Sequence, residues 1–216
     1  YVYFENQYFR HKELADLIRN VRRKLKQNGW KRDFYIFVVT NVPPDAGRVN
    51  TYEMLAALGK ASTMPTIHKK EGSNEPSSEA ALRKADLDGI HIHVATLATC
   101  AQIGQEMRYK EIYVHSKLML IDDVFFTLGS ANVNVRSMEA DSELNIACPS
   151  PELTRQLREQ LWKIHTKKAP SDDMKNEFRD WGDIMAKNLK NKEAKKPLVA
   201  PLLEFFDDGT SKAALD

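Results

Sequence analysis

The hydrophobic residues near the start of the chain follow two patterns, continuous apolar runs typical of strands and the spacing typical of helices. Residues 1–5 and 34–40 are almost entirely aromatic or β-branched, a composition typical of buried strands. Residues 12–28 carry apolar side chains at helical spacing and predict an amphipathic helix that ends at Gly29. A second helix is expected over residues 51–60.

The pattern continues as strands after one long interruption. Residues 62–86 are rich in Ser, Pro and charged side chains and predict a long loop, helical in part near its end. Strands are expected at four further places, which are residues 90–97, 111–121, 124–128 and 142–147. Strands that alternate with helices predict an α/β fold with a mixed β-sheet flanked by helices.

The character of the chain changes near residue 150. Ser150 followed by Pro151 is a helix start signal, and Ser171 can cap another helix. We therefore expect a C-terminal helical extension over residues 150–216 that packs on a first domain of residues 1–149. An apolar stretch at 197–206 is expected to pack against another surface.

Composition narrows the class of protein. The 216 residues include 32 basic and 30 acidic side chains, so a polycationic nucleic-acid binder is not indicated. The two cysteines cannot form a four-cysteine zinc site, and no apolar run approaches the roughly 18 residues of a membrane-spanning helix. His91 and His93 share a strand face without a metal-binding pattern around them, so we expect packing there and no metal or cofactor.

The sharpest chemical signal is His-x-Lys-x4-Asp followed by Gly-Ser-x-Asn. Side chains alternate faces along a strand, so His115 and Lys117 are expected to share a face. Ser130 and Asn132 share a face at the end of the next strand, and Gly129 permits close approach of backbone. Paired strands would bring together an imidazole, an ammonium, a hydroxyl and an amide, a set that suits a phosphate.

Asp122, the last residue of His-x-Lys-x4-Asp, is expected to have a different role. It lies an odd number of residues from both His115 and Lys117, so a regular strand points it to the opposite face. We therefore expect Asp122 to be a structural hydrogen-bond acceptor that makes no contact with substrate.

These motifs resemble the phospholipase D superfamily. The segment 3–9 (Tyr-Phe-Glu-Asn-Gln-Tyr-Phe) is similar to the start of the second catalytic half of eukaryote-type phospholipases D, and 113–119 resembles that group's second signature. The resemblance covers about residues 1–148. Val135 stands where the group usually has Asp. Eukaryote-like motifs combined with such a departure resemble bacterial members, notably phospholipase D effectors of type VI secretion systems.

The resemblance implies hydrolysis of a phosphodiester through a phosphohistidine, without metal, at a site built from two signatures. One His attacks phosphorus, and the other protonates the leaving alcohol and then activates water. His115 is expected to be the acid/base, because the second signature usually supplies it, although the residues alone leave both roles open. Glu143, 28 residues after His115, fits the carboxylate that orients the catalytic His, with Asp141 as the alternative.

The expected site has two sets of residues. Glu5, Asn6 and Gln7 end a strand, where they either line the site or satisfy backbone groups at a turn. The catalytic set is expected to be His115, Lys117, Asn132 and Glu143, and the substrate-binding set Ser130, Gly129, Glu5, Asn6 and Gln7.

The function that we expect is hydrolysis of membrane glycerophospholipids to phosphatidic acid and free headgroup. The protein would act as a secreted antibacterial effector at the periplasmic or membrane face of a target cell, with a cytoplasmic, membrane-associated location as the alternative. Three other functions stay open: a nuclease or phosphodiesterase of the same superfamily, a phospholipid synthase, and a binding module with an inert site.

One signature is half of an active site, so a partner is expected. Residue 1 falls where a second catalytic half begins, which favours an N-terminal half carrying the other His-x-Lys motif, as a separate or cleaved chain, over a symmetric copy of this chain. A phospholipid membrane surface and a cognate immunity protein are further expected partners, and nucleic acid is not.

Overall fold

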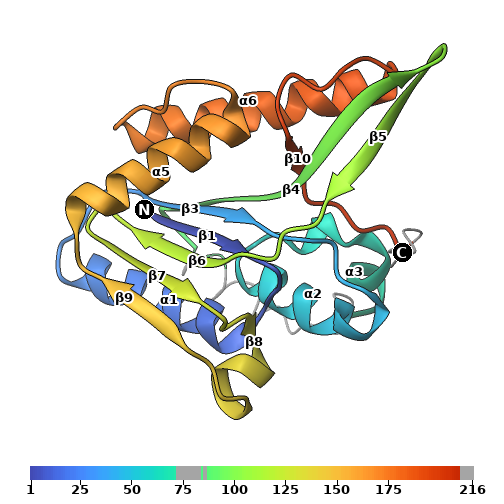
Figure 1. Ribbon diagram of the computed structural model, residues 1–216. Helices are drawn as coiled ribbons and strands as arrows, with labels where there is room; N and C mark the ends of the chain where they lie inside the picture. The colour runs from blue at the N-terminus through green and yellow to red at the C-terminus, as the bar shows by residue number, and fades with distance from the viewer. Residues whose placement is uncertain (72–83, 85–86, 210–216) are drawn as a thin grey trace.

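A mixed β-sheet of eight strands runs through the described part of the molecule, a computed structural model that covers residues 1–71, 84 and 87–209 (Figure 1). Its strand order is β10-β4-β3-β1-β6-β7-β9, and β5 pairs with β4 outside this path. The strands are β1 (Val2–Asn6), β3 (Phe34–Val39), β4 (Ile90–Ile103), β5 (Glu106–Ile112), β6 (Lys117–Ile121), β7 (Phe125–Gly129), β9 (Asn145–Cys148) and β10 (Leu202–Glu204).

Parallel and antiparallel pairing meet at β1. This strand pairs in parallel with β3, and β3 pairs in parallel with β4. On its other side β1 is antiparallel to β6, which continues through β7 to β9. A separate parallel pair joins β2 (Phe9–Arg10) to β8 (Val133–Asn134). The predicted mixed sheet is therefore confirmed.

Helices cover both faces of the sheet (Figure 1). One layer holds α1 (Lys12–Gln27), α2 (Arg48–Ala57) and α3 (Pro65–Glu71), and the other holds α5 (Pro151–Thr166) and α6 (Met174–Glu193). Short helical turns lie at η1 (Asp45–Gly47), η2 (Ala61–Thr63) and η4 (Arg136–Ala140). Because strand side chains alternate faces, Phe4 and Ile36 pack toward the first layer, and Tyr3 and Phe37 toward the second.

The two C-terminal helices share the core of the sheet. Trp162 of α5 and Trp181 of α6 are both 0% exposed. The rings of Trp162 and Trp181 contact the rings of Tyr3 and Phe37, with centroid distances from 4.6 to 6.2 Å. None of the helices in the described residues has the length and apolar character needed to cross a membrane.

The predicted strand over residues 111–121 is wrong, because the chain leaves the sheet in its middle. β4 and β5 form a long hairpin that projects from the sheet (Figure 1), and β6 begins only at Lys117. The intervening residues 113–116 are not in a strand, because β1 ends at Asn6 and offers no further pairing. His115 is consequently exposed and Lys117 is buried, so the alternation argument does not apply to this pair.

Other expected boundaries also differ, and β4 runs to Ile103 where the predicted strand ends at residue 97. The strand predicted over 142–147 begins later, at Asn145. Asp173 caps α6 in place of Ser171, because its carboxylate accepts the first free backbone amides of the helix. In the predicted loop over 62–86, η2 and α3 occupy the part before residue 72, whereas 72–83 and 85–86 lie outside the described residues.

The apolar stretch at 197–206 docks on the protein itself. It forms strand β10, which pairs antiparallel with β4. Leu202 and Phe205 are both 0% exposed and join the cores on opposite faces of the sheet. The C-terminal extension is therefore not purely helical, because it also supplies an edge strand.

Candidate active site

The His-Ser-Lys segment is held by an asparagine in place of a neighbouring strand. Asn41, just after β3, accepts a hydrogen bond from the Val114 amide through Oδ1 (2.8 Å). Its Nδ2 donates to the carbonyl oxygens of Val114 (2.8 Å) and Gln7 (3.0 Å). The backbone amide of Gln7 also donates to the carbonyl of Ser116 (3.0 Å). These bonds satisfy backbone groups of Val114 and Ser116 although this segment lies outside the sheet.

Lys117 is buried and its ammonium is fixed in place. Its Nζ donates to Gln7 Oε1 (2.9 Å) and to the carbonyl oxygen of His115 (2.8 Å). Burial lowers the pKa of the Lys117 ammonium, and the Glu143 carboxylate nearby opposes this effect. Within the described residues, the exposed imidazole of His115 makes no hydrogen bond. The segment therefore presents an accessible imidazole beside a fixed cation.

Glu5 supports the His-Ser-Lys segment through Ser116. Its side chain is buried, and Oε1 accepts from the Ser116 hydroxyl (2.6 Å). Oε2 accepts from the Tyr3 hydroxyl (2.5 Å) and lies 2.9 Å from His165 Nε2. Burial raises the pKa of Glu5, but the hydrogen bonds from His165, Ser116 and Tyr3 outweigh it and hold the pKa below its usual value. Glu5 thus fixes the residue between His115 and Lys117.

His165 is a site-supporting residue that the sequence analysis missed. It comes from α5, is 4% exposed and lies 160 residues from Glu5 in the chain. Two signals could have found it. It follows Trp162 by three residues, which places both on one helix face. It also begins a second His-x-Lys-x4-Asp string that ends at Asp172.

The second string is not a second copy of the site. Its histidine lies at the end of a helix and faces Glu5, and its lysine, Lys167, has the left-handed backbone of a helix C-terminus (φ +58°). No Gly-Ser-x-Asn follows it in the sequence. The spacing matches, but the buried imidazole of His165 has no access to a substrate.

Asn6 and Gln7 link the two motif segments. Asn6 Oδ1 accepts from the amides of Val133 (3.1 Å) and Tyr8 (3.2 Å), and its Nδ2 donates to the carbonyl of Ala131 (3.4 Å). The sequence left two roles open for Asn6, lining the site or satisfying backbone groups at a turn. Its side chain satisfies backbone groups. Gln7 instead positions the Lys117 ammonium.

The Gly-Ser-x-Asn segment begins at the last residue of β7 and packs against the start of β9. A Cβ on Gly129 would lie 2.2 Å from the carbonyl oxygen of Leu144, so the glycine permits the close backbone approach that the motif predicts. Ser130 Oγ accepts from the Leu144 amide (3.0 Å). Asn132 Oδ1 is buried and has no hydrogen-bond partner among the described residues.

Glu143 faces the lysine side of the site. Hydrogen bonds from the hydroxyls of Ser130 and Ser137 hold the pKa of Glu143 below its usual value, and the positive charge of Lys117 adds to this effect. The described contacts do not include a hydrogen bond from the His115 imidazole to Glu143. The orienting role of Glu143 toward the catalytic imidazole therefore stays a prediction.

The two aspartates of the motif region lie elsewhere. Asp122 follows β6 at the end opposite Lys117, where its carboxylate accepts from the backbone nitrogen of Tyr1. Asp141, the alternative to Glu143, forms an exposed ion pair with Arg136 (3.0 Å). These contacts give both carboxylates structural partners.

One group of side chains has the spacing of a metal site within the described residues. Ligand atoms of His11, Glu13 and Glu139 lie within 4.8 Å of one another. His11 Nδ1 accepts from the Leu14 amide (3.2 Å), so the neutral ring carries its proton on Nε2, which faces Glu139 (3.1 Å). This arrangement leaves the imidazole no free lone pair for a metal.

His93 is a packing residue. Its ring stacks on Phe178 with a centroid distance of 3.7 Å, and its Nε2 lies 2.8 Å from the Phe178 carbonyl oxygen. Burial lowers the pKa of His93 to about 4. His91 stacks on Tyr35 instead, so the two histidines do not converge on a common ligand.

A mixed sheet with His115, Lys117, Ser130, Asn132 and Glu143 in or beside its strands β6, β7 and β9 is typical of the phospholipase D superfamily. Within it, the chain belongs to the family described as "Cardiolipin synthase, PLD-like domain", whose model matches residues 1–165. The match extends past residue 149 to the end of α5 and includes His165.

Individual relatives match shorter stretches. Phospholipase D alpha 4 of Arabidopsis thaliana is 40% identical over 79 residues, which are 33% of this chain and 10% of that protein. Phospholipase D alpha 1 of Ricinus communis is 35% identical over 109 residues, which are 45% of this chain and 12% of that protein. The chain thus spans about a tenth of the length of these relatives. Among solved structures, NucT from Helicobacter pylori covers 75% of this chain and 76% of its own, with a TM-score of 0.41 and 14% identity.

Proposed function

We propose that this chain is one catalytic half of a phospholipase D that hydrolyses the distal phosphodiester of membrane glycerophospholipids. The observation that carries the proposal is the joining of the two motif segments by Glu5, Asn6 and Gln7. This triplet contacts the His-Ser-Lys segment through Ser116 and Lys117, and contacts the Gly-Ser-x-Asn loop through backbone groups. An accessible imidazole, a fixed ammonium and neutral donors together suit a phosphodiester.

The chemistry requires two histidines. One imidazole nitrogen bonds to phosphorus while the bond to the headgroup oxygen breaks, and the other imidazole gives that oxygen its proton. Water then forms the new P–O bond, the N–P bond breaks, and the second imidazole takes the proton from water. We assign this acid/base role to His115. Lys117 offsets charge on the phosphoryl oxygens.

The other histidine is proposed to come from an N-terminal half of the protein, as a separate or cleaved chain, or from a symmetric copy. Support comes from the buried position of His165, which excludes the second His-x-Lys string of this chain as the source. Mixing the chain with a candidate half and measuring the recovery of activity identifies the partner. No recovery with any half or copy would contradict this part of the proposal.

Phosphatidyl transfer is the second candidate reaction. The matched family is described as a cardiolipin synthase, and an alcohol can take the place of water at a phosphohistidine. Product mass separates the two reactions, because transfer makes a larger lipid and hydrolysis makes phosphatidic acid.

The central experiment compares the assembled enzyme on phosphatidylethanolamine vesicles and on plasmid DNA, both with EDTA present. We expect headgroup release from lipid and intact plasmid. His115→Ala should lower the rate by roughly three orders of magnitude or more. His91→Ala, a change of the same kind outside the site, should leave the rate unchanged. Cleaved DNA with intact lipid would instead identify a nuclease.

The cellular setting is part of the same proposal. By its resemblance to secreted effectors, the protein would act on membranes of a target cell and be neutralised by an immunity protein. Directing the assembled enzyme to the bacterial periplasm tests this idea. Toxicity that depends on His115 supports it, and growth equal to that of the His115→Ala control contradicts it.

A further inference from the structure

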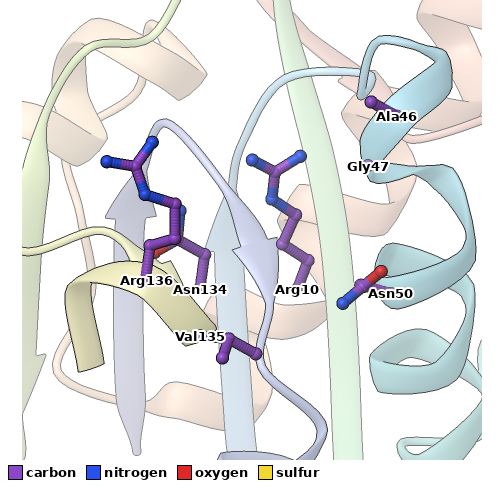
Figure 2. A pocket seen from close by; sticks show the side chains of 7 residues that line it. All are labelled: Arg10, Ala46, Gly47, Asn50, Asn134, Val135 and Arg136. Atoms are coloured by element: carbon purple, nitrogen blue, oxygen red, sulfur yellow. The ribbon is translucent and has the colours of Figure 1, made fainter. Parts of the chain in front are cut away.

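A small cationic pocket lies next to the candidate active site. It has a volume of about 160 Å³, and the residues around it include Arg10, Asn50, Asn134 and Arg136 (Figure 2). By the volume of liquid water, this space corresponds to about five water molecules, which is enough for one phosphate or carboxylate group.

The fold ties this pocket to the motif segments. Arg10 ends β2, three residues after Gln7, and Asn134 ends β8, two residues after Asn132. Arg10 and Asn134 are paired in register across the β2–β8 ladder. The pocket is therefore formed in part by β2 and β8, the strands that directly follow the two segments of the candidate site.

Arg10 is the main cation of the pocket. Its guanidinium lies 3.9 Å from the ring centroid of Tyr8, and no carboxylate in the described part of the chain pairs with it. The absence of a side chain at Gly47 makes room for it, since a Cβ there would lie 1.8 Å from Arg10 Nη1. An unpaired, half-buried guanidinium favours a planar or phosphate anion.

The other lining groups are compatible with the same ligand. The side chains of Arg10 and Arg136 extend in the same direction in Figure 2, although Arg136 also pairs with Asp141 (3.0 Å). Asn134 Oδ1 accepts from the Ser137 amide (2.8 Å), so its remaining polar group is a donor. The pocket therefore offers positive charge and N–H donors.

We propose that the Arg10 pocket binds a second anionic group, a phosphate or carboxylate carried by the headgroup of the lipid substrate. This proposal rests on the proposed lipid hydrolysis, in which His115 and Lys117 engage the scissile phosphate. The pocket would favour lipids whose headgroup carries its own anion over lipids with an uncharged headgroup.

The test uses three short-chain lipids in neutral detergent micelles, so that surface charge stays low. Their headgroups are glycerol, serine and glycerophosphate, and the last two add a carboxylate and a second phosphate. We expect Arg10→Gln to lower kcat/KM about 10-fold or more, through KM, on the preferred anionic headgroup. The loss on the glycerol headgroup should stay below about 3-fold, in keeping with a contact made only by the added anion.

Two further variants sharpen the result. Gly47→Ala should reproduce the loss, because its Cβ displaces the guanidinium from a different element of the fold. Arg32→Gln removes an exposed arginine that also lies over an aromatic ring, Trp30, and should leave kcat/KM unchanged on all three lipids. Equal losses on all three lipids, or no loss in Arg10→Gln, would overturn the proposal, as would an effect confined to DNA cleavage.

Failure of the proposed function is distinguishable from failure of the pocket. If the assembled enzyme hydrolyses none of the three lipids, the proposed function fails. Calorimetry then measures the affinity of the wild-type protein and of Arg10→Gln for inorganic phosphate. Weaker binding in the variant supports the pocket, and equal binding overturns it.

Discussion

Replacing His165 by alanine tests whether the C-terminal helices are part of the active-site scaffold. The change removes the imidazole that faces Glu5 at 2.9 Å, where the two side chains are only 5% and 10% exposed. Solvent can therefore replace little of the lost interaction. Removing one partner of a buried pair typically costs 3–5 kcal/mol, because the other charge is left unpaired.

The size of the effect follows from what remains around Glu5. Ser116 and Tyr3 continue to donate to the carboxylate, so we expect the lower end of the range, about 3 kcal/mol. For a chain of this length, each kcal/mol shifts Tm by about 2–4 °C, so Tm should fall by about 6–12 °C. Urea unfolding and thermal melts followed by circular dichroism measure both quantities.

A matched exposed pair provides the control. His91 lies 3.3 Å from Asp33, with the side chains 42% and 48% exposed, so His91→Ala should cost less than about 1 kcal/mol. A cycle with Glu5→Gln should give a coupling energy of about 1 kcal/mol or more between residues 5 and 165. A His165→Ala protein within about 0.5 kcal/mol of wild type, or strictly additive effects, would show that the Glu5–His165 contact does not stabilise the fold.

The candidate site and the buried His93 together give four further predictions. The pKa of Glu5 is held below its ordinary value of 4.5, so its stabilisation is complete above that pH and is lost on acidification; urea melts should show wild type losing its advantage over Glu5→Gln as pH falls. Asn41→Ala removes three hydrogen bonds around the His-Ser-Lys segment and should cost about 2 kcal/mol in urea melts, with lipid hydrolysis reduced more than 10-fold. Gly129→Ala forces a Cβ against the Leu144 carbonyl oxygen and should cost about 1–3 kcal/mol in the same melts. NMR titration should place the pKa of His93 at about 4, so this ring lowers stability only as pH falls below its unfolded value of 6.5.

Each of these predictions has an outcome that contradicts it. Asn20→Ala, on the exposed face of α1, is the control for Asn41→Ala, and equal effects of the two would remove the special role of Asn41. A pH-independent difference between wild type and Glu5→Gln would show that the Glu5 charge does not contribute. An unchanged stability in Gly129→Ala, or a His93 titration near 6.5, would contradict the described packing.

The sequence predicted most of the sheet, because β1, β3 and the first part of β4 are rich in aromatic and β-branched residues. Residues of these types favour strands. The prediction failed over 111–121 because the strand pattern there continues through a segment that has no partner strand. What holds that segment is Asn41, a polar side chain after a different strand. Local periodicity carries no information about such a substitute for pairing.

The candidate site was predicted by motif spacing, but the roles of its members came from contacts. Glu5, Asn6 and Gln7 were expected near the site, yet only the structure separates the support of Ser116 from the positioning of Lys117. His165 lies too far along the chain for spacing to connect it with Glu5. Long-range partners of this kind depend on how α5 docks, which the sequence pattern predicts only as a helix with an apolar face.

The distance between Glu5 and His165 along the chain has a consequence for biosynthesis. A chain growing from its N-terminus completes β6, β7 and both motif segments while Glu5 still lacks its imidazole partner. The carboxylate beneath Ser116 obtains that partner only when α5 has emerged and docked, and long-range contacts of this kind form late. Maturation of the site is thereby coupled to synthesis of residues well beyond the motifs, so that a nascent or truncated chain ending before residue 165 carries the signature without its full support.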